Sequence, residues 1–164
     1  MIINGKDLMI LVNSVLADIG YKKKKDIWYK DHTECLCYYT IGKSFYGGQY
    51  GSAFGCFLKE LYPPSFFMVN SPEYALASLR VGFSFFINDK EQITKPFDLE
   101  NSNFSGNERE LEIKYLIQNY VIPFLDEIST KEGIKEIYTK NPRIIHYMDA
   151  KLKRALGINF QNQN

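Results

Sequence analysis

The sequence lacks the features that place a chain in the easily recognised protein classes. Its 164 residues include two histidines, three cysteines and one tryptophan. Lys and Arg (20) almost balance Asp and Glu (19), so the formal net charge is +1 at pH 7. General binding of nucleic acid needs many unopposed cations against the phosphates. The charge balance therefore argues against that class.

Long hydrophobic runs are also missing. None approaches the roughly 20 apolar residues that a membrane-spanning helix needs. The apolar residues 8–12 are soon followed by Asn13 and Asp18 without a small-residue cleavage site, so we interpret them as part of an ordinary helix. An odd number of cysteines without a disulfide-framework spacing fits a reducing compartment. We expect a soluble, cytoplasmic protein.

The motifs of the common enzyme classes are absent as well. There is no nucleophile elbow, P-loop or dinucleotide-binding glycine fingerprint. His146 is followed three residues later by Asp149, which could orient its imidazole, but no nucleophile is marked by the sequence. An exposed helical pair is the simpler interpretation. We predict no catalytic residues and lean against an enzyme.

Aromatic residues are abundant: 12 Tyr, 12 Phe and the one Trp make 15% of the chain. Large rings suit pleated sheets and fill a core with few residues. A chain of this length buries roughly 70% of its unfolded surface, enough for a core without disulfides or metal. We expect most of the rings to be core, with some left to line a groove.

The first half of the chain predicts one helix and then strands. Asn4 is a helix cap, apolar residues repeat at helical spacing, and Gly20 suits a left-handed end. Apolar and alternating segments at 27–29, 35–41, 53–58 and 79–87 predict strands, and without long helical crossovers between them they are most easily joined antiparallel. Because several are apolar on both faces, both faces of the sheet should be at least partly covered.

The second half predicts helices. A short edge strand is expected near Phe97 and Leu99, and a capping box at Ser105 should open a long helix to 128, bent at Pro123. Further helices should start at Ser129, with Glu132 completing a box, and at Asn141-Pro142, the last one pointing Ile145, Met148, Leu152 and Ala155 inward and ending at Gly157. The fold class is α+β: an antiparallel sheet of about four to five strands, with the N-terminal helix and the C-terminal helices packed on it. We expect a single domain over 1–158 and a disordered polar tail at 159–164.

Cysteines and lysines offer two further hypotheses, and each has a plainer explanation. Cys35 and Cys37, with Cys56 or His32, could suggest a metal, but residues two apart on a strand lie about 7 Å apart, too far for ideal tetrahedral thiolates. Buried free thiols are the better interpretation, and a Cys35–Cys56 disulfide is not expected in the cytoplasm. We predict no metal and no cofactor. The lysines at 22–25 are interpreted as a solvated strand edge.

Several segments resemble the bacterial domain-of-unknown-function 4304 family. They are GYKKK at 20–24 and WYK at 28–30, KSFYGGQY at 43–50, and IPFLDEIST at 122–130 followed by Gly133. The segment at 80–83 is more aromatic and less polar than the family pattern. The resemblance implies the α+β fold and an intracellular bacterial origin. It brings no catalytic residues, because the family has no established chemistry.

The leading functional hypothesis is a non-catalytic binding protein, of which toxin-neutralising immunity proteins are one kind. Its contacts would be Trp28, Lys43, Tyr46 and Tyr50, since aromatic rings beside a lysine are typical of recognition surfaces. The partner would be another protein, and a homo-oligomer stays open.

The alternative hypothesis is a small-molecule-binding protein or an enzyme with a polar pocket on the sheet. That pocket would use Lys43, Ser44, Arg80 and Ser84, with Arg80 and Ser84 on one face of a strand. The last-ranked hypothesis is a weak nucleic-acid binder using the lysines at 22–25 and the basic last helix.

Overall fold

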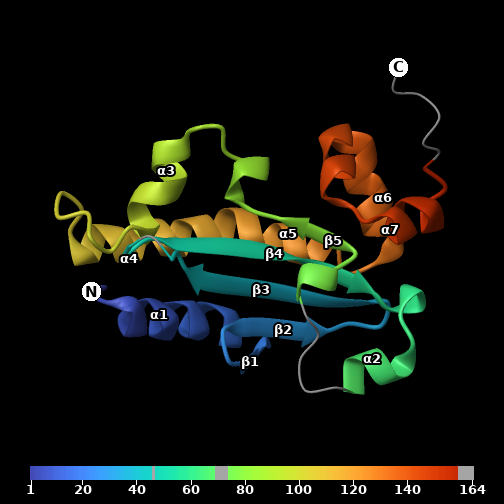
Figure 1. The fold of residues 1–164 in the computed structure, drawn as a ribbon, viewed down its shortest axis with the longest axis horizontal. Helices are drawn as coiled ribbons and strands as arrows, with labels where there is room; N and C mark the ends of the chain where they lie inside the picture. Colours follow the sequence, from blue (N-terminus) through green and yellow to red (C-terminus); the bar gives the residue numbers. More distant parts are fainter. Residues whose placement is uncertain (46, 69–73, 159–164) are drawn as a thin grey trace.

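The computed structural model describes residues 1–45, 47–68 and 74–158, and its fold is α+β. Five strands form one antiparallel sheet in chain order: β1 (Lys22–Lys24), β2 (Ile27–Asp31), β3 (Cys35–Lys43), β4 (Tyr50–Leu58) and β5 (Leu79–Val81) (Figure 1). Each pair of neighbours is antiparallel. The first three connections are too short for a parallel crossover, whereas β4 and β5 are joined by the longer segment 59–78. The predicted fold class is confirmed.

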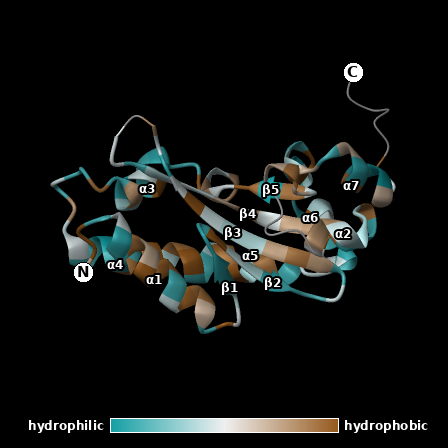
Figure 2. Cartoon of the chain, turned by 60° about the horizontal axis from the view of Figure 1, so that its bottom comes forward, coloured by the Kyte–Doolittle hydropathy of each residue, from teal (hydrophilic) through white to brown (hydrophobic). Residues whose placement is uncertain are grey.

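One face of the sheet carries the main core. It is covered by α1 (Gly5–Ala17) and by a long helical rod made of α4 (Gly106–Leu116), a π-turn (Ile117–Val121) and α5 (Ile122–Glu127) (Figure 1). Figure 2 shows hydrophobic residues gathered in α1, α5 and the central strands. Phe54 of β4 contacts the rings of Tyr39, Phe83, Phe86 and Phe124. These aromatic rings therefore serve chiefly to pack the main core.

The opposite face is covered over part of its area. Leu36, Tyr38 and Phe57 form a second, smaller cluster with aromatic residues from the segment that follows β4. That segment contains a 3-10 turn, Lys59–Leu61, and α2 (Pro64–Met68). The rest of this face, toward the β3–β4 turn, holds small residues. This uncovered part of the sheet is where the grooves described below are found.

The remaining described elements are short or lie near the C-terminus. The helices are α3 (Lys90–Thr94), α6 (Lys131–Lys140) and α7 (Ala150–Ala155). The 3-10 turns are Tyr74–Leu76, Phe83–Phe85, Lys95–Phe97 and Pro142–Tyr147. Within the described residues, no helix combines the length and apolar character needed to cross a membrane. The predicted tail at 159–164 lies outside the described residues.

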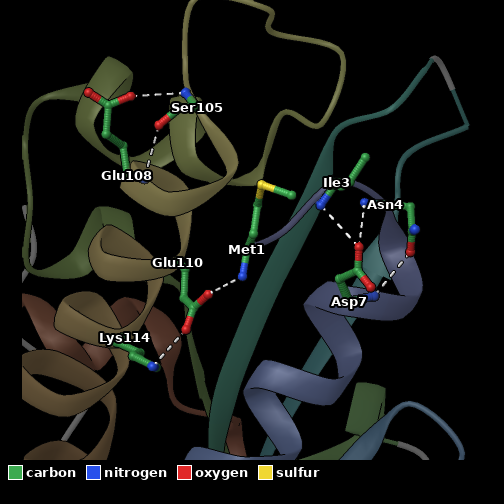
Figure 3. A network of polar contacts seen from close by, with 8 residues as sticks. All are labelled: Met1, Ile3, Asn4, Asp7, Ser105, Glu108, Glu110 and Lys114. Atoms are coloured by element: carbon green, nitrogen blue, oxygen red, sulfur yellow. Dashed lines mark hydrogen bonds and ion pairs between the residues drawn. The ribbon is translucent and has the colours of Figure 1, made fainter.

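Local end signals in the sequence were accurate. Asn4 and Asp7 form a capping box at the start of α1, and Ser105 and Glu108 do the same for α4 (Figure 3). Gly20 follows α1 with φ of 87°, the left-handed conformation expected of it.

The start of the chain joins the start of α4. The Ile2 amide donates to the Gly106 carbonyl at 3.1 Å, and the Met1 amino group lies 2.5 Å from the Glu110 carboxylate (Figure 3). A Cβ atom at Gly106 would stand 2.7 Å from the Ile2 carbonyl oxygen, so this close approach needs glycine.

The structure corrects the predicted fourth strand. Pairing with β4 ends at Val81, and Phe83–Phe85 forms a 3-10 turn where the alternation to residue 87 predicted a strand. The reason is burial: Phe83 and Phe85 are both buried, and Phe86 packs on the same core from the turn. The predicted edge strand near Phe97 is likewise a 3-10 turn, Lys95–Phe97, tied to the hairpin by an isolated Gln49–Asp98 bridge.

Three helix details also differ from prediction. The helix predicted to bend at Pro123 contains a π-turn immediately before that residue, and this wider turn accommodates a residue that lacks an N–H. The cap of α6 is Thr130, one residue after the predicted Ser129, and its hydroxyl accepts from the Gly133 amide. The last predicted helix is divided into a 3-10 turn and α7, and Ile144 is the buried residue where Ile145 was expected.

Candidate functional site

Two adjoining grooves lie at the end of the sheet nearest the β3–β4 turn. The first, called here the hairpin groove, has a volume of about 430 Å³ and lies between that turn, the 3-10 turn at Phe83–Phe85 and α3. The polar residues that line it are Lys43, Ser44, Gln49, Tyr50, Ser52, Ser84 and Thr94. The second, the sheet groove, has a volume of about 470 Å³ and lies between the β1–β2 turn and β5. Its lining includes Lys25, Asp26, Ile27, Thr40, Ala53 and Arg80.

Small residues create the open space. Gly42 of β3 and Gly51 of β4 are directly opposite each other, and a Cβ atom built on either would have no other atom within 4 Å. Both glycines and Ser52 line both grooves, so the two grooves adjoin at this part of the β3–β4 hairpin. Two pairs further along the ladder, on the same face, Thr40 lies opposite Ala53, which again leaves little side-chain bulk above the sheet.

The β1–β2 turn forms one wall of the sheet groove. Two residues, Lys25 and Asp26, connect the strands, and Lys25 has a φ of 54°, as the first position of a tight hairpin turn requires. The Thr40 hydroxyl donates to the Asp26 carbonyl at 2.9 Å and holds this turn against β3. The side chains of Lys25 and Asp26 are both exposed.

The structure brings together most of the residues predicted as contacts. Lys43, Ser44, Tyr50 and Ser84 all line the hairpin groove. Lys43 is exposed, and it lies opposite the half-buried Tyr50 at the last pair of the β3–β4 ladder. Tyr46 lies outside the described residues.

Arg80 and Ser84 do not share a strand face as predicted. Arg80 is on β5 and lines the sheet groove, whereas Ser84 is in the 3-10 turn and lines the hairpin groove. The strand ends at Val81 because the phenylalanines after it turn into the core. Arg80 is exposed, so the prediction of a polar pocket enclosing it needs correction.

Trp28 is not at the surface. Its side chain has no exposed area, its ring packs against Tyr39, and its indole N–H donates to the Asn13 side chain at 3.1 Å. Lys23, its partner across the β1–β2 ladder, places its ammonium 4.9 Å from the ring centroid. Trp28 therefore belongs to the main core, and we remove it from the proposed contact residues.

Sequence reasoning missed Phe45 and Lys25. Phe45 lies in the β3–β4 turn, directly after Ser44, and is as exposed as in an extended chain (101%). The signal in the sequence is its position: a large apolar residue between Ser44 and the turn glycines, where no strand face can bury it. The prediction treats Lys25 as one of the lysines of a strand edge. Its position in a two-residue turn is the signal that distinguishes it from them.

The buried tyrosine beside the grooves, Tyr39, holds its proton firmly. The Tyr39 hydroxyl shares a 2.8 Å hydrogen bond with the Ser52 hydroxyl, and burial raises the pKa of Tyr39 above its ordinary range. A tyrosine that holds its proton this firmly does not act as a base near neutral pH. What the grooves supply is cations, hydroxyls and open backbone, a set that suits non-covalent binding.

The cysteines are packed in the main core. Cys35, Cys37 and Cys56 are free and fully buried, with Cys37 and Cys56 opposite each other in the β3–β4 ladder. The Cys37 thiol donates to the Leu125 carbonyl at 3.4 Å. Burial raises the pKa of Cys37, and a hydrogen bond with the Cys35 thiol together with burial raises that of Cys56. Over the part of the chain that the structure describes, no group of three or more Cys, His, Asp or Glu side chains is arranged to hold a metal ion.

The histidines lie away from the grooves. His146 is exposed, and its predicted partner Asp149 instead caps α7, accepting from the Leu152 amide at 2.6 Å. His32 is half-buried in the turn before β3, where burial and the nearby Lys30 lower its pKa.

Comparison with known proteins gives a family and no function. A family model described as "Domain of unknown function (DUF4304)" matches residues 12–127, which include the whole sheet and both grooves. No curated protein and no solved structure matched the chain. Because the matched segment covers well over half of its length, the chain belongs to the DUF4304 family.

Proposed function

We propose that this chain is a non-catalytic binding protein that recognises another protein through the β3–β4 turn and the hairpin groove. The observation that carries the proposal is Phe45, whose whole side chain is exposed beside the groove residues Lys43 and Ser44. Leaving a phenylalanine in water forgoes the roughly 1.5–3 kcal/mol that its burial would contribute. Large rings beside cations are typical of the residues that dominate protein interfaces.

The location of Phe45 strengthens this argument. Turns at the end of a rigid sheet often carry function, since the strands hold their bases in place while their tips stay accessible. Lys43 and Tyr50 form the last pair of the ladder below the turn, and Tyr50 packs against Gly5 at the start of α1. A partner that covered Phe45 would therefore meet a firmly supported surface.

A small-molecule enzyme is less well supported. That hypothesis requires a pocket that encloses polar groups and excludes water, whereas Arg80, Ser84 and Lys43 are exposed. Three buried free thiols fit the reducing cytoplasm that we propose as the location. A toxin-neutralising immunity protein is one kind of binding protein that fits this proposal.

Native mass spectrometry of the tagged protein, purified gently from its host, tests the proposal. The wild-type chain should retain a stoichiometric foreign subunit, and Phe45→Ser should lose it. Leu111→Ser is the matched control, because Leu111 is also largely exposed (69%) but lies on α4. A wild-type chain without a foreign subunit, or equal retention by Phe45→Ser, would contradict the proposal.

A further inference from the structure

We propose that the partner presents an extended acidic segment, which runs from the hairpin groove into the sheet groove and places its carboxylates on Lys43, Lys25 and Arg80. This inference rests on the proposed function and specifies the chemistry of the partner. Gly42, Gly51 and Ser52 line both grooves, so the two grooves adjoin where one segment would pass from the turn toward the far wall of the sheet groove.

The charge of the grooves favours an acidic occupant. Their combined lining contains the basic residues Lys25, Lys43 and Arg80 but a single acidic residue, Asp26. Among the described residues, neither Lys25 nor Lys43 has a carboxylate partner. Elsewhere six lysines do have one: Lys59, Lys95, Lys114, Lys131, Lys135 and Lys140. No described carboxylate therefore neutralises the charge of the two groove lysines, in contrast to these six.

The spacing of the cations favours a chain over a single small anion. Lys25 adjoins β2 and Arg80 is on β5, so three strand spacings separate their backbones, or about 14 Å. An extended chain rises about 3.4 Å per residue, so residues i and i+4 are also about 14 Å apart and point to the same side. Carboxylates four residues apart thus match the two walls, whereas one compact anion would reach one wall at a time.

The floor of the grooves fits a backbone passing close to the sheet. Gly42 and Gly51 are exposed and carry no side chain, and Thr40 and Ala53 add little bulk. A segment crossing at this level keeps its acidic side chains near the cations of both walls. Complementary charges of this exposed kind mainly raise the association rate and make binding sensitive to salt.

The test uses an NMR titration of the ¹⁵N-labelled full chain with a synthetic nine-residue peptide that alternates Glu and Ser. A peptide with Gln in place of Glu and inorganic phosphate are the comparison probes. The Glu peptide should shift the amides of Gly42, Gly51 and Ser52, and added NaCl should weaken its binding. Equal shifts with the Gln peptide, shifts confined to other regions, or the same shifts with phosphate at equal concentration would each overturn the acidic segment.

Charge-neutralising variants test the contribution of each groove lysine to peptide binding. Lys25→Asn, which tolerates the positive φ, and Lys43→Gln should each weaken the Glu peptide by about two- to five-fold. Lys22→Gln is the matched control, since Lys22 is an exposed lysine of the same β1–β2 hairpin that lines neither groove. Unchanged affinity in both groove variants would contradict the inference.

The two proposals fail in distinguishable ways. If the partner seen by native mass spectrometry is lost in Phe45→Ser but retained at full affinity by Lys25→Asn and Lys43→Gln, the binding function stands and the acidic segment is wrong. If Phe45→Ser retains the partner fully, the proposed function itself is wrong.

Discussion

Gly42 and Gly51 lie directly opposite each other in β3 and β4, and a Cβ atom at either position would meet no other atom within 4 Å. Glycine weakens a strand, because it loses more backbone entropy on folding than other residues and offers no side chain for packing. Two glycines in facing positions with free space above them therefore have no packing explanation. Their effect is to lower the floor that joins the two grooves.

The first prediction concerns this space. Gly51→Ala should leave the free energy of unfolding unchanged or raise it by up to about 1 kcal/mol, because alanine restricts the unfolded chain and meets no clash. Gly55→Ala, on the same strand and face, should lower it by about 1–3 kcal/mol, since its Cβ would overlap the Leu79 carbonyl oxygen. Urea unfolding of the two variants measures both values. Equal destabilisation would show that Gly51 is needed for the fold.

The second prediction concerns the one tryptophan. Because Trp28 is fully buried, its fluorescence should be blue-shifted in the native protein and insensitive to iodide until the chain unfolds. Trp28→Ala should cost about 3–5 kcal/mol of stability, as expected for a large ring lost from a packed core. Strong iodide quenching of the native protein would instead restore Trp28 as a surface contact.

The third prediction compares two buried tyrosines. The Tyr21 hydroxyl is buried and has no hydrogen-bond partner among the described residues, whereas the Tyr39 hydroxyl is bonded to Ser52 at 2.8 Å. Tyr21→Phe should therefore stabilise the protein or leave it unchanged, because it removes a desolvated polar group. Tyr39→Phe should cost about 1 kcal/mol. Thermal denaturation of the two variants measures the difference, and a larger loss in Tyr21→Phe would point to a bonding partner for its hydroxyl.

The fourth prediction is an alkaline loss of stability. Burial raises the pKa of the Cys37 thiol above 9.0 and that of the Tyr21 hydroxyl above 10.0, their ordinary values. The folded chain then keeps protons that the unfolded chain releases, so the free energy of unfolding must fall as pH rises above about 9. Urea midpoints between pH 7 and 10.5 measure this slope. A flat profile would contradict the burial of these groups.

The same burial predicts slow thiol chemistry. All three cysteines should resist a thiol-specific reagent at pH 8 in the native protein and react fully in denaturant, because the folded core keeps the reagent away from the buried sulfur atoms. Rapid reaction of one native thiol would show that the β3–β4 core opens locally.

Local signals along the chain were sufficient to predict many of the elements. Asn4, Ser105 and Gly20 act through bonds or backbone conformations within a few residues, so the sequence alone reveals the helix ends they form. Prediction failed where distant packing competed with local pattern. The alternation after Leu79 is typical of a strand, yet Phe83, Phe85 and Phe86 are pulled into the core by Phe54 and Phe124, and the strand stops at Val81.

The sequence by itself determined that this chain forms an antiparallel sheet with helices on it, because hydrophobic periodicity and the lack of long helical crossovers between the strands leave few other arrangements. It also marked Lys43, Ser44 and Tyr50 as neighbours, since they flank one turn. Only the tertiary structure decided which rings face water: Trp28 is buried under α1, and Phe45 is exposed at a turn. The tertiary structure alone showed that Lys25 and Arg80 line the same groove. These residues are far apart in sequence, and their proximity depends on strand order and register.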